Sequence, residues 1–235
     1  MNVRAIRTRL FHEKEPLVQF IVEHVSRIKE GSIVVVTSKI VALAEGRVTD
    51  IASDKEKTRI IRSESEFAIK TKHAWLTIKD GVVLPSAGVD ESNAQGRLIL
   101  LPKDSFTQAA RIRRALKKHY RLKRLGVIIT DSRVLPLRAG VVGVALGYAG
   151  FHGVKDYRGK QDLFDRPLKI TRVDVADSLA TAAVFEMGEG AERRPLAVIQ
   201  DVEVEFCERI NRNELKIKLT DDLFKPLFAR LKGLL

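Results

Sequence analysis

Apolar segments of two kinds alternate along the chain, and their alternation predicts an α/β protein. Residues 16–29 place Leu17, Phe20 and Ile21 on one helical face, and Gly31 would end that helix. Longer helices are predicted at residues 107–124 and 175–187. A branched apolar run predicts a buried strand at 33–36, and further strands are predicted at 98–101, 127–130, 169–173 and 196–199.

Shorter sequence patterns predict the remaining helices and strands. Thr37 and Ser38 would cap a short helix at residues 40–45, which Gly46 would end. A terminal helix would open at Thr220 or Asp221 and carry an apolar stripe, with Pro226 in its first turn. Residues 139–150 combine small and branched side chains with glycines, a pattern typical of strands that pass close to another backbone.

No repeat, low-complexity tract or proline-rich linker divides the sequence. We therefore expect a single unit over residues 1–235, with a smaller lobe possible around residues 140–175. The expected fold class is α/β in the mixed α+β sense, with helices packed on mixed sheets.

The composition and net charge restrict which cellular compartment and which kinds of binding partner we expect. One cysteine, Cys207, excludes an intramolecular disulfide and favours a reducing compartment. The first 16 residues lack the apolar core of a secretory signal, and the apolar run 139–151 is shorter than the ~20 residues of a membrane span, so we expect a soluble cytoplasmic protein. The formal charge of +12 indicates anionic partners, which could be nucleotides, polycarboxylates or nucleic acid.

Two loops offer groups that could bind phosphate or a base. Ser38 and Lys39 follow the strand 33–36 at the start of a helix, where hydroxyls, amides and an ammonium group suit a phosphate. An ordinary helix cap uses the same residues. In the loop 86–93, Asp90 could bind metal and Asn93 could contact a base or ribose, although an Asx turn has the same composition.

The strand 127–130 delivers a carboxylate and a hydroxyl, Asp131 and Ser132, to its carboxyl end. Ligands of α/β proteins gather at this edge, and Mg²⁺ or Mn²⁺ takes oxygen ligands from one or two carboxylates plus substrate phosphate. Asp90 and Asp131 on separate loops would suit such an ion. The alternative is that Asp131 only caps the following turn.

Two further segments carry charged groups beside glycines. In residues 155–166 the guanidinium of Arg158 next to Gly159 could bind a carboxylate, or the loop could be a surface ion-pair loop. Gly188 and Glu189 would form a flexible turn with a carboxylate directly after the helix 175–187. An ordinary glycine C-cap followed by a solvated glutamate would have the same residues. The sequence has neither a Walker glycine-lysine loop nor a GxGxxG motif, and its histidines lack zinc-site spacing.

Taken in order, these segments resemble the γ-glutamyl ligase family of the deazaflavin coenzyme F-420 pathway. The resemblance extends from about residue 31 to residue 199. It rests on VVVTSKIVALAEGRV, SAGVDESNAQG, VIITDS, RAGVVGVALGYAG, KDYRGKQDLFDRPL and DSLATAAVFEMGE.

The resemblance implies GTP-dependent addition of L-glutamate to a substrate carboxylate, with Mg²⁺ or Mn²⁺ and K⁺, in an intertwined homodimer. It implies that Asp90, Asp131, Ser132 and Glu189 hold the metals. Ser38, Lys39, Asn93, Gly188 and Glu189 would bind the nucleotide. The predicted catalytic residues are Arg138 and Arg158.

Three departures from the family pattern bear on the substrate. Residues 133–138 replace a stretch in which the family has a second arginine and a tryptophan, Leu43 stands where a nucleotide-contacting lysine is common, and residues 8–15 match poorly. The acceptor could therefore be the deazaflavin precursor or a folate-like carboxylate. A rival interpretation is a non-catalytic RNA-binding relative that uses the basic helix 111–124, although small anionic substrates are the favoured partners and nucleic acid is not.

Overall fold

The computed structural model describes residues 1–92, 94 and 96–228, and the side chains of Leu219, Leu227 and Phe228 are left out of the description. A central sheet has the strand order β1-β12-β2-β8-β9. Its strands are β1 (Asn2–Ile6), β2 (Ser32–Thr37), β8 (Leu125–Val134), β9 (Val141–Ala149) and β12 (Leu196–Gln200). Only the β2–β8 pair is parallel, and its register sets Thr37 opposite Thr130.

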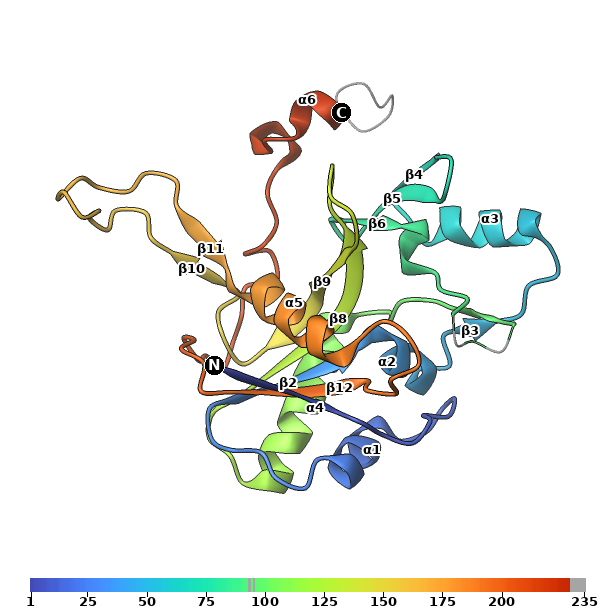
Figure 1. Cartoon of the computed structure of the whole chain (residues 1–235), viewed down its shortest axis with the longest axis horizontal. Helices are drawn as coiled ribbons and strands as arrows, with labels where there is room; N and C mark the ends of the chain where they lie inside the picture. Colours follow the sequence, from blue (N-terminus) through green and yellow to red (C-terminus); the bar gives the residue numbers. More distant parts are fainter. Residues whose placement is uncertain (93, 95, 229–235) are drawn as a thin grey trace.

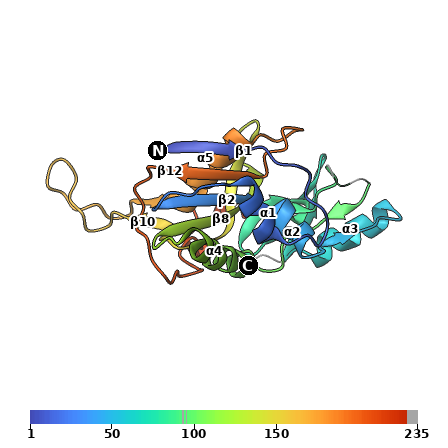
Figure 2. The ribbon, with the colours of Figure 1, turned by 90° about the horizontal axis from the view of Figure 1, so that it is seen from below.

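Helices cover both faces of this sheet. On one face lie α1 (Leu17–His24), α2 (Ser38–Ala44) and α4 (Ser105–Tyr120), and on the other lies α5 (Val175–Met187). Figure 2 shows α4 and α5 on opposite sides of the strands. Alternate residues of β2 serve the two cores, because Val34 and Val36 pack toward α4 whereas Ile33 and Val35 pack toward α5. The expectation of helices packed on a mixed sheet is confirmed.

Three smaller sheets project from this body (Figure 1). The antiparallel sheet β4 (Phe67–Lys70), β5 (Trp75–Lys79) and β6 (Val82–Pro85) lies with α3 (Asp54–Ser63) at one end. Strands β3 (Val48–Thr49) and β7 (Leu98–Ile99) pair beside α2. Strands β10 (Val154–Asp156) and β11 (Arg172–Asp174) form the base of a projecting hairpin, residues 154–174, which we term the arm.

Several predicted boundaries are corrected. The first helix ends at His24, not near residue 29, because Val25 leaves helical geometry with φ −116° and ψ 89°; the His24 ring binds the Phe20 carbonyl oxygen 2.8 Å away. The strand predicted at 127–130 runs on to Val134. The terminal segment has a short 3-10 turn at Leu219–Asp221 and a helix, α6, only at Lys225–Phe228; the rest of the predicted stripe lies outside the described residues.

The sequence analysis missed β1, α3 and the β4–β6 sheet. Strand β1 alternates exposed Asn2 and Arg4 with half-buried Val3 and Ala5, so it lacks a continuous apolar run. The start of α3 did carry a sequence signal for a helix N-terminus, Ser53 followed three residues later by Glu56. In the structure Ser53 accepts a hydrogen bond from the Glu56 amide, and the Glu56 carboxylate accepts one from the Ala52 amide. In the part of the chain that the structure describes, every helix is too short or too polar to span a lipid bilayer.

Candidate functional site

A pocket of about 450 Å³ opens where several strand ends meet beside α2 and the end of α5. Its position follows from the sheet. Strands β2 and β8 are parallel with Thr37 opposite Thr130, so Ser38, which follows β2, and Asp131, which lies on β8, come to the same edge. Strand β12 is antiparallel to both β1 and β2, which brings the loop before Leu196 and the loop after Ile6 to that edge too.

Most of the predicted site residues line this pocket. They are Ser38, Lys39, Asp90, Asp131, Ser132, Gly188 and Glu189. Asn93 lies outside the described residues. Segments that are far apart in sequence thus converge on one cavity.

Asp131 lies at the junction of β8 and α2. Its carboxylate accepts a hydrogen bond from the Ser132 amide, 2.8 Å away, and one from the Ser38 side chain. Burial of the carboxyl group, helped by the nearby charge of Asp90, raises the pKa of Asp131 to about 6. Thr37 occupies the N-cap position of α2 as predicted, but its side chain makes no capping hydrogen bond. Ser38 is the first residue of the helix, and its side chain hydrogen-bonds to Asp131 instead of capping.

Asp90 is held across the pocket by Lys39. The Lys39 ammonium lies 2.7 Å from Asp90 Oδ2 and also donates to the Ser92 hydroxyl and carbonyl. Burial would raise the pKa of Asp90, but hydrogen bonds from Lys39 and Ser92 outweigh it and lower that pKa. The loop reaches this place through left-handed φ angles at Ser86, Ala87 and Gly88.

Glu189 follows the end of α5. The helix ends at Gly188, whose φ of 79° suits glycine, and the Ser132 hydroxyl donates to Glu189 Oε2 at 3.3 Å. Burial and the charge of Asp90 raise the pKa of Glu189. Two carboxyl groups with raised pKa values in one pocket mark a place where a positive ligand would be favoured.

The donor set suits a hard cation, although it is not assembled into a metal site. Within the described ranges, no group of three or more His, Cys, Asp or Glu side chains is arranged to hold a metal ion. Asp90, Asp131, Ser132 and Glu189 nevertheless supply the carboxylate and hydroxyl oxygens that Mg²⁺ and Mn²⁺ prefer. They could hold such an ion with ligands from a bound phosphate.

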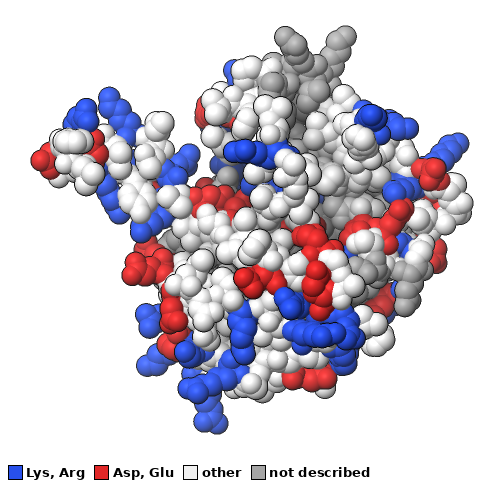
Figure 3. All heavy atoms as spheres, viewed as in Figure 1, with Lys and Arg blue, Asp and Glu red and all other residues white. Residues whose placement is uncertain are grey.

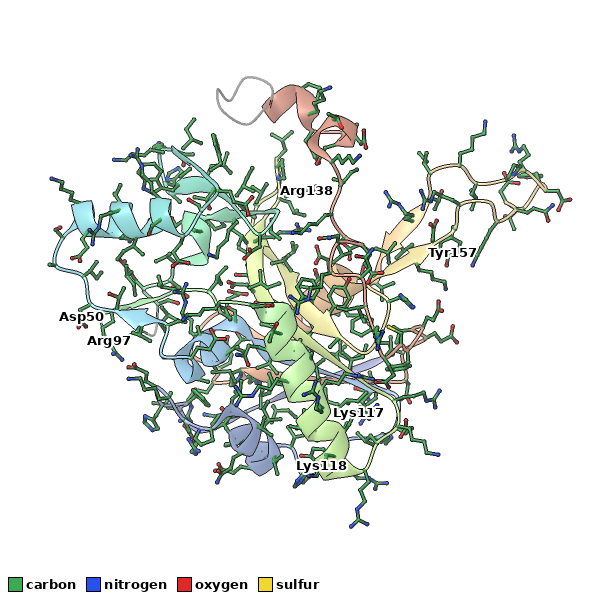
Figure 4. The ribbon with its side chains drawn as sticks, turned by 180° about the vertical axis from the view of Figure 1, so that it is seen from behind. Asp50, Arg97, Lys117, Lys118, Arg138 and Tyr157 are labelled. Carbon is green, nitrogen blue, oxygen red and sulfur yellow. The ribbon has the colours of Figure 1, made fainter. Side chains whose placement is uncertain are left out.

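The two predicted catalytic arginines are not brought to this pocket. Arg138 lies at the tip of the β8–β9 hairpin, exposed, and Arg158 is on the arm, where it forms an ion pair with Asp156. Figure 4 shows Arg138 and the arm residue Tyr157 on separate projections. The sequence could not show this, because both residues follow strands that extend beyond the body of the protein.

Sequence reasoning also missed residues of the pocket. Thr8, Arg9 and Phe11 come from the loop after β1, and Glu192, Arg193 and Arg194 come from the loop before β12. Only the antiparallel pairing of β1 and β12 places them here. Their single sequence signal is a pair of arginines directly before Pro195 and a buried strand.

Some side chains of the basic helix that was considered as an RNA contact instead form interactions within the protein. Arg113 is buried, donates to the Leu125 carbonyl and binds both carboxylate oxygens of Glu208. Lys117 binds the same carboxylate. Lys117 and Lys118 lie on α4 in Figure 4, and basic and acidic side chains are interspersed over the face drawn in Figure 3.

The fold and the pocket together define an α/β protein with a mixed-charge ligand site at the edge of its central sheet. Residues 5–201 match the sequence profile of the family described as F420-0:Gamma-glutamyl ligase. The chain is 33% identical over 216 residues to the coenzyme F420:L-glutamate ligase of Methanocaldococcus jannaschii, covering 84% of this chain and 86% of that one.

Two further relatives have the same name. The Methanothermobacter thermautotrophicus protein is 36% identical over 190 residues, with 73% of this chain and 75% of that one covered. The Archaeoglobus fulgidus protein is 32% identical over 226 residues, with 87% and 90% covered. The chain belongs to the F420-0:γ-glutamyl ligase family, as the sequence motifs suggested.

Proposed function

We propose that the protein is a GTP-dependent ligase that joins L-glutamate to the carboxylate of a deazaflavin coenzyme precursor. The observation that carries this proposal is the convergence of Ser38, Lys39, Asp90, Asp131, Ser132 and Glu189 on one pocket. Family membership and the names of the relatives support the same reaction. A folate-like acceptor is the alternative, because residues 133–138 depart from the family pattern.

The chemistry explains these residue types. A carboxylate is a poor acylating agent, so the γ-phosphoryl group of GTP would first move to the acceptor carboxylate, giving an acyl phosphate and GDP. The amine of glutamate would then attack the acyl carbon, and phosphate would leave. Bound Mg²⁺ or Mn²⁺ would neutralise the charge of the phosphates in this transfer.

The chain's own residues would position three anionic reactants. Lys39 lies at the start of α2 and can turn from Asp90 toward a phosphate, while Ser38 keeps Asp131 oriented. Asp90, Asp131 and Glu189, with Ser132, would hold the divalent ions, and K⁺ is proposed as an accessory cation. The cytoplasmic location stays a prediction from the sequence.

The test of this proposal is product formation. Protein incubated with GTP, Mn²⁺, L-glutamate and the deazaflavin precursor should give an acceptor heavier by one glutamyl residue, with one GDP per amide bond, as measured by mass spectrometry and chromatography. Parallel mixtures should replace GTP by ATP and the acceptor by a folate. Absence of a glutamylated product with every acceptor would refute the ligase proposal.

We further propose that the protein is a homodimer joined through its projections. The arm exposes Leu163, Phe164 and Ile170, which are 97%, 75% and 86% accessible, and the tip of the β8–β9 hairpin exposes Leu137 fully. Apolar side chains gathered on projecting hairpins indicate contact with another protein surface. A second copy is favoured because both projections carry such side chains, which allows a symmetric contact.

Changing one of these side chains should therefore break the dimer. Leu163→Glu is expected to shift the protein from dimer to monomer in sedimentation equilibrium, because a carboxylate would be buried at the contact. Ile69→Glu, on the exposed β4 strand away from the arm, is the matched control. A wild-type protein that sediments as a monomer at all concentrations would exclude the dimer.

A further inference from the structure

We propose that the loop of residues 188–195 binds the amino acid that is joined to the acceptor, with Arg193 and Arg194 holding its carboxylates and Glu192 its ammonium group. This inference rests on the proposed function and identifies which part of the pocket recognises glutamate. Glu192, Arg193 and Arg194 were not among the site residues predicted from the sequence.

Two other cations of the pocket, Lys39 and Arg9, are already paired with carboxylates. Lys39 binds Asp90 and Ser92, and Arg9 binds both Glu15 and Glu23. Among the described residues, the Arg193 guanidinium has no ion pair or hydrogen bond, and Arg194 donates only to the Glu186 carbonyl at 3.2 Å. Arg193 and Arg194 therefore keep donors that can bind a ligand carboxylate in a bidentate manner.

Backbone hydrogen bonds fix the segment that carries these arginines. The Thr8 amide donates to the Arg193 carbonyl at 2.9 Å, and the Thr37 amide donates to the Pro195 carbonyl at 3.0 Å. Arg193 has a φ of 55°, a left-handed angle that a residue with a side chain rarely adopts, and these flanking bonds hold it there. The guanidinium is thus carried by a positioned segment that spans β1 and β2.

The loop carries charges of both signs. Glu192 is folded back over the start of the loop, where its Oε2 accepts from the Gly190 amide at 2.8 Å and its carboxyl lies against Gly188. A carboxylate thus lies next in sequence to two guanidinium groups that keep unused donors among the described residues. This combination of charges complements a zwitterionic amino acid, whereas a polyphosphate placed against Glu192 would be repelled.

Steady-state kinetics of Arg193→Gln and Arg194→Gln would test the assignment. Each change should raise the KM for L-glutamate about tenfold or more, with kcat and the Kd of GTP nearly unchanged, because a charge-assisted hydrogen bond to the amino acid is lost. Discrimination against L-glutamine should fall in the same variants, because the missing guanidinium no longer binds the side-chain carboxylate that glutamate has and glutamine lacks. Glu192→Gln should also raise the KM for glutamate.

Arg209→Gln is the matched control, because Arg209 is exposed and lies outside the pocket. A weaker Kd for GTP with an unchanged KM for glutamate would assign the arginines to phosphate and overturn the inference. An increase confined to the KM of the acceptor would overturn it as well. Wild-type protein that makes no glutamylated product would instead refute the proposed function itself, so the two failures are distinguishable.

Discussion

Asp131→Asn is expected to raise the free energy of unfolding near neutral pH while abolishing nucleotide binding that depends on Mn²⁺. Burial raises the pKa of Asp131 to about 6, well above its ordinary 3.8, so the ionised carboxylate is a cost in the folded protein. Asparagine keeps an oxygen that can accept from Ser132 and removes the charge. The expected gain is up to about 3 kcal/mol, measured by denaturant unfolding near pH 7.5.

The sign of the pH dependence follows from the raised pKa. Above about pH 6 the folded wild type bears the full cost of the carboxylate, whereas below about pH 4 the group is protonated in both states and the cost vanishes. The difference in stability between Asp131→Asn and wild type should therefore shrink as the pH falls from about 6 to about 4.

Asp90→Asn supplies a control of opposite sign. The Lys39 ion pair and the Ser92 hydrogen bonds lower the pKa of Asp90, so its removal should cost stability and leave Lys39 without its partner. Calorimetry with GTP and Mn²⁺ should show loss of binding for both variants. Equal, tight binding by wild type and Asp131→Asn would refute the metal assignment.

Gly143→Ala should destabilise the protein by about 2 to 4 kcal/mol, since it forces apart two packed backbones. A Cβ at Gly143 would lie 2.4 Å from the Ala180 carbonyl oxygen and 2.7 Å from the Thr181 amide nitrogen, both in the middle of α5. The hydrogen bond from the Thr181 hydroxyl to the Gly143 carbonyl fixes this approach. Helix α5 would have to move off β9, which would shift Gly188 and Glu189 at its end.

Gly140→Ala is the matched substitution in the same hairpin. No atom lies within 4 Å of its Cβ position, so the expected cost is only about 1 kcal/mol for its left-handed φ of 89°. Thermal unfolding and GTP binding should both separate the two variants. Equal effects at Gly140 and Gly143 would contradict the close approach of α5.

The predictions that succeeded share a local cause. The helix predicted at residues 175–187 is α5, because alanine-rich sequence favours helix and Gly188 ends it. The buried strands at 33–36 and 196–199 lie inside β2 and β12, because continuous branched apolar runs need cover on both faces. The glycines of 139–150 predicted close backbone contact, and Gly143 and Gly147 have it.

The predictions that failed depended on long-range contacts. Ser38 has the chemistry of a helix cap, yet the parallel pairing of β2 with β8 sets it beside Asp131. Arg138 and Arg158 have the chemistry of carboxylate binding, yet hairpin geometry carries them away from the pocket of their own chain. Residue type alone does not fix the distance between side chains.

For this protein, the sequence by itself determined the main helices and the buried strands of the central sheet, and which loops carry carboxylates, hydroxyls and glycines. Those properties depend on neighbouring residues and on hydrophobic periodicity. The tertiary structure alone decided that Arg9, Arg193 and Arg194 share a pocket with Asp131. That outcome depends on β12 pairing antiparallel with β1 and β2. These pairings join residues as far apart as Asn2 and Gln200, and they leave no local trace in the sequence.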